Sequence, residues 1–217
     1  MRILFPLVAS VMLASGAGAA TMTLDFSGDI CNGGGSCGSG SQIDQSYGDV
    51  AGQVDVIHDA DRSLPGLQDL RHWGPGYETL DHVAYGLLNG GGLSILFDAL
   101  AGYEVTVHGF DIAPYADRER DTLVQVIDMM DGTKLVYETY TPLSTAGITS
   151  FSGTWTSAAG IQINLGPDAW DIGISNIEYS VAPTQVTGPA AVPLPAAGWM
   201  LIAGLGGLGL MRRRKTA

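Results

Sequence analysis

The chain has 217 residues, enough for one ordinary domain, and its 46% hydrophobic and 15% charged content excludes an intrinsically disordered chain. All 22 acidic residues lie between Asp25 and Glu178. This segment contains only five basic residues, so its formal charge is −17. Such an acidic segment repels phosphate backbones, which excludes nucleic-acid binding and favours a protein that binds cations or stays soluble in salty water.

Residues 1–20 have the three parts of a secretory signal peptide. Arg2 supplies the positive start, Ile3–Leu13 is an apolar run, and small residues follow up to Ala20. The run is too short for a comfortable membrane span, and Ala17-Gly18-Ala19 fits the A-x-A cleavage rule. We therefore expect export through the Sec translocon and cleavage by signal peptidase, in preference to a buried N-terminal helix.

Residues 21–181 contain many short strand-like segments separated by Gly, Asp, Asn and Pro. Apolar and polar residues alternate, and no long apolar stripe of helical period is visible in the sequence. This pattern predicts an all-β fold, a two-sheet jelly-roll sandwich in preference to a barrel. The expected strands are Thr21–Phe26, Gln53–Ile57, His82–Leu88, Leu93–Leu100, Tyr103–Phe110, Leu123–Ile127, Lys134–Tyr140, Thr149–Thr156, Ile161–Leu165 and Ile172–Val181.

Two turn signals predict which strands pair as hairpins. Asn89-Gly90-Gly91-Gly92 connects the expected strands His82–Leu88 and Leu93–Leu100. Asp131-Gly132 stands between the two strands that follow Tyr103–Phe110. We expect a hairpin at each place.

Cys31 and Cys37 are the only cysteines, and they bracket a glycine-rich loop. In an exported chain, two cysteines this close predict a disulfide, worth about 2 kcal/mol on the chain-entropy model. Free thiols, a metal pair and a redox pair are the alternatives. No histidine lies within 20 residues of Cys37, and the C-x-x-C spacing of redox pairs is absent.

Aromatic side chains on loops are candidates for ligand binding, because such rings stack on sugar faces while polar neighbours bind hydroxyl groups. Trp73 and Tyr77 lie in the turn-rich segment Trp73-Gly74-Pro75-Gly76-Tyr77. Trp155 and Trp170 are candidates of the same kind, but we expect both to pack in the core or at a sheet edge instead.

The charged segment Asp111–Asp121 carries the remaining candidates for ligand binding. It adds Tyr115, Arg118 and Arg120 to the possible contacts with a carbohydrate. The alternative is a self-paired surface loop, in which the arginines pair with neighbouring acidic residues.

The C-terminal tail has three parts. Val192, Pro193, Leu194, Pro195 and Ala196 come first, an uncharged segment runs on to Met211, and Arg212, Arg213, Arg214 and Lys215 follow. As a helix, the 16 residues from Ala196 to Met211 would span roughly 24 Å, slightly short of a bilayer core of about 30 Å. The four cations would hold the C-terminus in the cytoplasm as a stop-transfer cluster.

This tail resembles the VPLPA-CTERM sorting signal, a variant of the PEP-CTERM signals of Gram-negative bacteria. The resemblance implies that an exosortase, a membrane-embedded protease or transpeptidase, recognises the motif of residues 192–196 and removes the transmembrane helix. The protein would be anchored transiently in the inner membrane and then reach the cell surface or the exterior. A permanent single-span anchor is the alternative. Residues 182–191, rich in Pro, Thr and Gly, read as a linker.

The segment Gly173–Ser180 resembles the last strand of galactose-binding-like jelly rolls found in carbohydrate-binding modules. Such modules often hold Ca²⁺ between their first and last strands, which implies Asp25, Asn176 and Glu178 as candidate ligands. Oxygen ligands of this kind suit Ca²⁺, and no other cofactor is expected.

Three functions are compatible with these features. The first is a non-catalytic structural protein of the cell envelope or extracellular matrix, and the alternative is a Ca²⁺-dependent module that binds exopolysaccharide. A secreted hydrolase is the third, but the spacing of the acidic and histidine residues indicates no catalytic set. We therefore expect a protein that is not an enzyme, and we name no catalytic residue.

Overall fold

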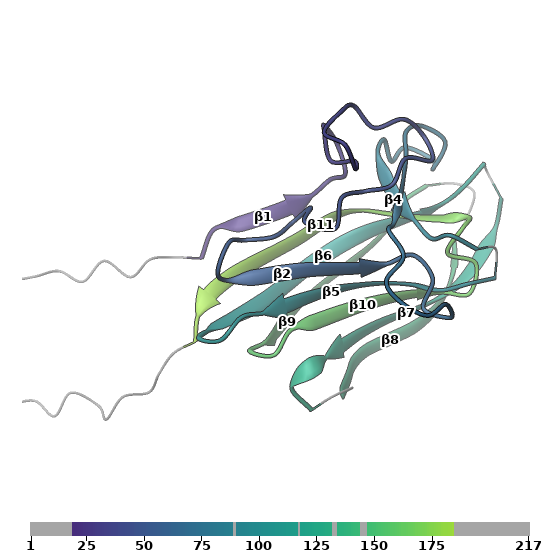
Figure 1. Ribbon diagram of the computed structural model, residues 1–217. Helices are drawn as coiled ribbons and strands as arrows, with labels where there is room; N and C mark the ends of the chain where they lie inside the picture. Colours follow the sequence, from purple (N-terminus) through teal and green to yellow (C-terminus); the bar gives the residue numbers. More distant parts are fainter. Residues whose placement is uncertain (1–18, 89, 117, 132–133, 144–146, 185–217) are drawn as a thin grey trace, which may run out of the picture. The chain divides into compact units, whose positions relative to one another are not determined.

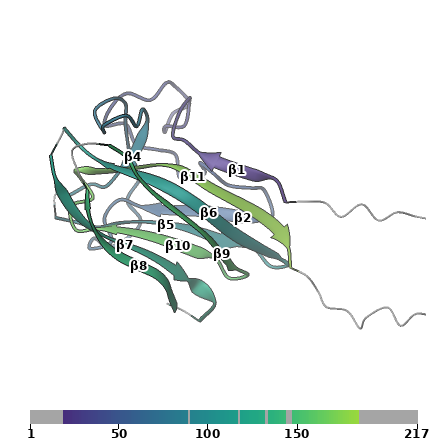
Figure 2. The same ribbon diagram turned by 180° about the vertical axis from the view of Figure 1, so that it is seen from behind.

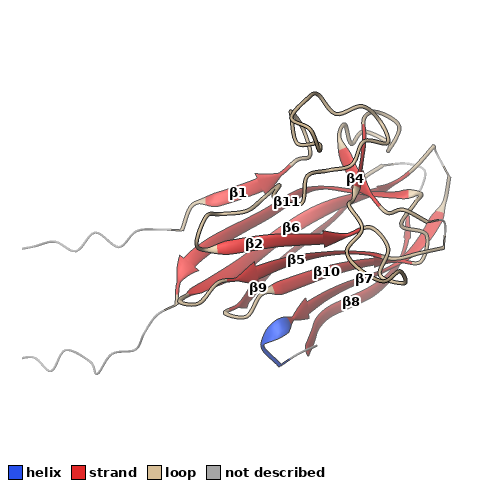
Figure 3. Cartoon of the chain, in the orientation of Figure 1, coloured by secondary structure: helices blue, strands red, loops and turns tan. Residues whose placement is uncertain are grey.

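The computed structural model describes residues 19–88, 90–116, 118–131, 134–143 and 147–184, which are almost all strand and loop (Figure 3). The helical element in this part is a single short 3-10 turn, η1 (Met129–Asp131). No helix among these residues is long and apolar enough to cross a membrane. The strands are β1 (Thr21–Leu24), β2 (Val54–Asp59), β3 (Arg71–Trp73), β4 (Val83–Tyr85), β5 (Leu93–Ala99), β6 (Tyr103–Pro114), β7 (Arg120–Asp128), β8 (Lys134–Leu143), β9 (Thr149–Ser157), β10 (Ile161–Gly166) and β11 (Ile172–Pro183).

These strands form two antiparallel sheets that stack as layers (Figure 1), seen from behind in Figure 2. One sheet has the order β3-β4-β11-β6-β9, and β1 pairs with the part of β11 that β4 leaves free. The other has the order β2-β5-β10-β7-β8. From β4 to β7 every connection passes from one sheet to the other, which is typical of jelly rolls. The predicted all-β, two-sheet jelly-roll sandwich is confirmed.

The core lies between the sheets because successive side chains of a strand point to opposite faces. In β2, Val54, Val56 and His58 are buried, whereas the residues between them are partly or fully exposed. Residues from both sheets complete the core, and they include Leu93, Ile95, Phe97, Val105, Val107, Phe110, Ile112, Val124, Val126, Ile161, Ile163, Leu165, Ile172, Ile174, Ile177 and Tyr179.

One of the two expected hairpins is present. β7 and β8 pair in antiparallel fashion around η1, as the turn signal at Asp131 predicts. The expected hairpin across residues 89–92 is wrong, because β4 pairs with β3 and β11 while β5 pairs with β2 and β10 in the other sheet. A glycine-rich connection of this length serves equally well as a crossover between the two layers.

The described chain enters and leaves the sandwich at the same end. Thr21 of β1 pairs with Ser180 near the end of β11, and the N–H of Thr184 donates to the carbonyl of Gly102 at 2.9 Å. The start of β11 lies at the opposite end, since its 12 residues at about 3.3 Å each span roughly 40 Å.

Several predictions concern residues outside the described part. They are the signal peptide up to residue 18, the sorting motif of residues 192–196, the transmembrane segment and the basic cluster of residues 212–215. Of the predicted linker, residues 182–183 belong to β11, and residues 185–191 lie outside the described residues.

Candidate functional site

Five aromatic side chains line a pocket at the end of the sandwich where β6 ends and β11 begins. This aromatic pocket has a volume of about 160 Å³, and none of the described residues that line it is charged. Trp170 is 42% exposed, whereas Tyr77 and Tyr85 are almost fully buried. The lining residues are Trp73, Tyr77, Tyr85, Tyr115 and Trp170.

The short hairpin of β3 and β4 supplies Trp73 and Tyr85. Arg71 pairs with Tyr85, and Trp73 pairs with Val83, so all four side chains lie on one face of the hairpin. The indole Nε1 of Trp73 donates a hydrogen bond of 3.0 Å to the carbonyl of Pro75. The turn after β3 therefore fixes the orientation of this indole.

The predicted disulfide is confirmed, since Cys31 and Cys37 are bonded. The chain that follows it runs beside β3. The N–H of His72 donates to the carbonyl of Ser41 at 2.8 Å, and the N–H of Gly40 donates to the carbonyl of His72 at 2.7 Å. β3 is thus held between β4 on one side and the segment after the disulfide on the other.

Two glycines leave room for the tyrosine rings of the pocket. Gly76 has a φ of +122°, and a Cβ added there would lie 3.1 Å from Cε2 of Tyr115. The same turn receives a hydrogen bond of 3.0 Å from the N–H of Ala116. A Cβ on Gly173 would lie only 2.8 Å from Cδ1 of Tyr77. Larger residues at either place would displace a ring of the pocket.

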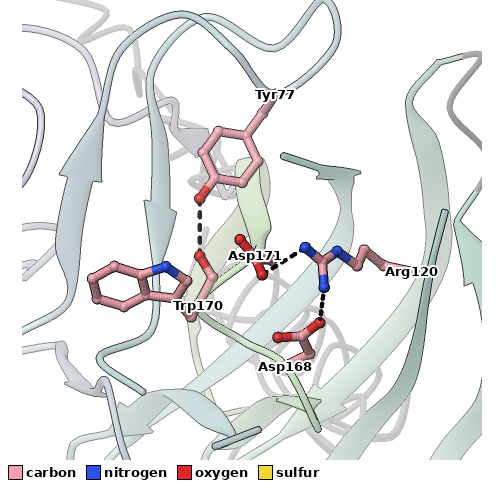
Figure 4. Close-up of polar contacts among 5 residues, drawn as sticks. All are labelled: Tyr77, Arg120, Asp168, Trp170 and Asp171. Atoms are coloured by element: carbon pink, nitrogen blue, oxygen red, sulfur yellow. Dashed lines mark hydrogen bonds and ion pairs between the residues drawn. The ribbon is translucent and has the colours of Figure 1, made fainter. Parts of the chain in front are cut away.

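An ion-pair network holds the loop that carries Trp170 (Figure 4). Nη1 of Arg120 lies 2.8 Å from Oδ2 of Asp168, and Nη2 lies 2.7 Å from Oδ2 of Asp171. The hydroxyl of Tyr77 donates to the carbonyl of Trp170 at 3.2 Å. The connection between β10 and β11 is therefore fixed from two sides.

Three of the five neighbouring ring pairs stand at steep angles, so the rings do not form one flat platform. Trp73 stands at 80° to Tyr115 and at 82° to Tyr85, and Tyr85 stands at 85° to Trp170. Burial is the main cause that raises the pKa of Tyr77 and of Tyr85 above the ordinary value, so both phenols stay neutral at physiological pH. The arrangement can enclose a small group with apolar faces, and its lining brings no carboxylate or imidazole to it.

The structure brings together three of the five residues that the sequence predicts as ligand contacts, namely Trp73, Tyr77 and Tyr115. Arg120 is engaged by two aspartates and does not line the pocket, although it borders a separate hollow of about 420 Å³ beside β7 and β8. Arg118 is exposed on the same loop. The expected self-pairing of this loop therefore does not hold for Arg120, whose partners come from the connection between β10 and β11.

Sequence reasoning misses two lining residues, Tyr85 and Trp170. Tyr85 lies inside an expected strand, where an aromatic residue is unremarkable, and Trp170 was expected to pack at a sheet edge. Trp155 meets that expectation, since it packs near Phe110 and Tyr137 with ring centroids 6.3 and 5.6 Å away. The turn residues just before Trp170, Gly166-Pro167-Asp168, are the signal that could have placed it on a loop.

Two of the three candidate Ca²⁺ ligands are engaged in hydrogen bonds of their own. Asp25 accepts a hydrogen bond of 3.0 Å from the N–H of Ser27, which is the main cause that lowers its pKa. Asn176 donates to Asp111 at 2.8 Å, and Glu178 is exposed on β11. Within the described residues, no group of three or more His, Cys, Asp or Glu side chains is placed to hold a metal ion. A Ca²⁺ site at this trio stays a prediction.

Comparison with protein families found no family model that matches the chain, and comparison with curated proteins found no match. Solved structures with a similar fold include one described as "CBM4 structure and function", with 13% identity and a TM-score of 0.30 over 66% of this chain and 99% of that one. Another is the CBM32 of AlyQ in complex with 4,5-unsaturated mannuronic acid, with 19% identity and a TM-score of 0.30 over 59% and 94% of the two chains.

A third similar structure is the Podospora anserina GH26-CBM35 β-(1,4)-mannanase, with 13% identity and a TM-score of 0.31. The match covers 64% of this chain but only 29% of the mannanase chain. Likeness at this level of identity and TM-score carries no inference about function. The function must be argued from the site itself.

Proposed function

We propose that the β-sandwich is a non-catalytic carbohydrate-binding domain and that the aromatic pocket is its binding site. The single observation that carries this proposal is the gathering of five aromatic rings at one end of the fold, from the β3–β4 hairpin and the connections that follow β6 and β10. Aromatic side chains in concave sites are the usual partners of the apolar faces of small ligands. The proposal thus takes up the alternative of the sequence analysis, without requiring Ca²⁺.

The size of the pocket supports recognition of one sugar ring. Its volume is about 160 Å³, and a protein cavity of about 150 Å³ is known to hold a single six-membered ring. Aromatic side chains at steep angles can contact the faces and the edge of one sugar ring, whereas a row of sugar rings would need a flat aromatic platform. The pocket therefore fits the end of a glycan chain or a single side branch.

Two features support a binding role in preference to hydrolysis. Among the described residues, no acidic side chain lines the aromatic pocket, whereas glycoside hydrolysis ordinarily needs two carboxyl groups that flank the scissile bond. Asp168 and Asp171, on the loop that carries Trp170, are both bound to Arg120. These carboxylates hold the loop and are not free to act on a ligand.

We further propose that the protein is exported and sorted by an exosortase to the cell envelope or matrix, through the motif of residues 192–196. The arrangement of the sandwich agrees with this role. The chain leaves the sandwich at the end of β11, whereas Trp170 precedes the start of that strand. The chain therefore continues toward the C-terminal tail from the end of the sandwich that lies opposite the aromatic pocket.

Binding to a glycan panel tests the proposed ligand class. The full chain in detergent should be retained by at least one neutral or amino-substituted exopolysaccharide. Trp170→Ala should weaken retention about fivefold or more, on the assumption that stacking on one ring contributes roughly 1–3 kcal/mol, as it does for nucleic-acid bases. Tyr140→Ala is the control, because Tyr140 is 61% exposed on β8, away from the pocket. Equal losses in both variants, or no retention of the parent chain, would reject the proposal.

Sorting is tested by following the C-terminus in a host that has an exosortase. Mass spectrometry should find the chain without residues 197–217, and replacing Pro193 and Pro195 by alanine should leave the intact tail in the membrane fraction. Identical processing of the two chains would mean that this motif is not recognised.

A further inference from the structure

The domain that carries the aromatic pocket is strongly acidic. Its formal charge of −17 comes from 22 acidic and five basic residues. A surface of one sign concentrates ligands of the opposite sign and repels those of the same sign. An anionic glycan would therefore meet repulsion on its approach to this domain, and a cationic one would meet attraction.

The excess of acidic residues extends to the segments that build the pocket. Residues 71–85, 115–121 and 168–171 together contain seven acidic residues and three arginines. Arg71, which pairs with Tyr85 across the β3–β4 hairpin, donates from Nη1 to the carbonyl of Gly40 at 3.1 Å. One of these arginines, Arg120, is already paired with Asp168 and Asp171. The acidic residues are Glu78, Asp81, Asp117, Glu119, Asp121, Asp168 and Asp171.

The pocket itself is suited to a positive charge. Cations are attracted to the faces of Trp and Tyr rings within about 6 Å of the ring centroid. Neighbouring centroids of the five rings are 5.1–6.4 Å apart, so the rings pack against one another, and a cation held in the pocket beside two of them interacts with more than one ring. In the described part of the chain, no lysine or arginine is among the lining residues that would repel it.

From these observations we infer that the glycan is cationic and that the aromatic pocket receives a sugar bearing a protonated amino group. The inference rests on the proposed function and names its substrate class. Ring faces would stack on the sugar and attract its ammonium group, while the acidic segments would raise its local concentration. Neutral glycans would bind through stacking alone, and glycans built from uronic acids would bind most weakly.

Matched oligomers test this inference with the full chain in detergent. Calorimetry should give at least tenfold tighter binding to glucosamine oligomers than to N-acetylglucosamine oligomers of equal length, because the acetyl group removes the charge. The difference should shrink as salt rises and as the pH is raised to deprotonate the amine. Equal or tighter binding of the acetylated oligomer would overturn the inference and leave the proposed function standing. No binding to either oligomer would overturn the inference, and no binding to any glycan would overturn both.

Two further arms separate the charge from the sugar. Tetramethylammonium carries the positive charge without the sugar and should compete only weakly with the glucosamine oligomer. If tetramethylammonium binds as tightly as the oligomer, the pocket does not select a sugar. Asp81→Lys, an exposed position between β3 and β4, should reduce the preference for the amine severalfold. The same change at exposed Asp55 on β2 should affect it less, and equal effects would contradict a local role of the pocket segments.

Discussion

Replacing Arg120 by methionine removes the cation that holds two carboxylates of the loop before β11. The side chains of Arg120, Asp168 and Asp171 are only 20%, 19% and 12% exposed, and both ion pairs are shorter than 3 Å. Breaking a buried ion pair costs about 3–5 kcal/mol because a charge is left without a partner. Partial exposure reduces this cost, so we expect the free energy of unfolding to fall by about 3 kcal/mol.

For a domain of this size, that loss corresponds to a fall in melting temperature of roughly 6–12 °C. Calorimetry and guanidinium unfolding measure it, with Arg118→Met as the matched control. Arg118 is exposed between β6 and β7, two residues before Arg120, and its replacement should change stability by about 0.5 kcal/mol or less. The Arg120 variant should also bind the glycan more weakly, because the loop carries Trp170. A loss of stability no larger than that of the control would refute the anchoring role of Arg120.

Three further predictions concern stability. Gly173→Ala would place a Cβ 2.8 Å from Cδ1 of Tyr77, so the free energy of unfolding in denaturant should fall by about 1–3 kcal/mol. A variant as stable as the parent would mean that the Tyr77 ring moves aside at no cost. Burial lowers the pKa of His58 below 6.5, so the unfolded chain binds a proton more readily than the folded chain does, and the free energy of unfolding should fall as the pH drops below 6.5. His58→Gln should flatten this pH dependence, and an unchanged slope would exclude His58 as its source. Replacing Cys31 and Cys37 together by serine should lower the free energy of unfolding by about 2 kcal/mol, whereas an unchanged value would show that this short loop is ordered without the bond.

The strands were predictable because their signal is local. Alternation in segments such as Tyr103–Phe110 reflects one face turned to the core, and the structure extends this strand to Pro114. β3 was missed because three residues are too few to show alternation. The crossover at residues 89–92 was mistaken for a hairpin because glycine-rich turns permit either path, and the choice depends on pairing with distant strands.

The site was only partly predictable, because it depends on which loops meet. Trp73 and Tyr77 stand on an evident turn, so their exposure could be inferred from the neighbouring Gly and Pro residues. Trp170 joins them through the pairing of β11 with β4 and β6, which no local pattern indicates. The role of Arg120 is likewise set by Asp168, 48 residues away along the chain.

The location of the bound ligand tests the central claim most directly. The chain has four tryptophans, and their indole N–H signals can be followed separately by NMR while the full chain in detergent is titrated with the glycan that it retains best. We predict that the signals of Trp73 and Trp170 shift together with a single dissociation constant, while that of Trp155 on β9 stays in place. Shifts at Trp155 without shifts at Trp73 and Trp170 would show that the glycan binds elsewhere and would contradict the aromatic pocket as the binding site.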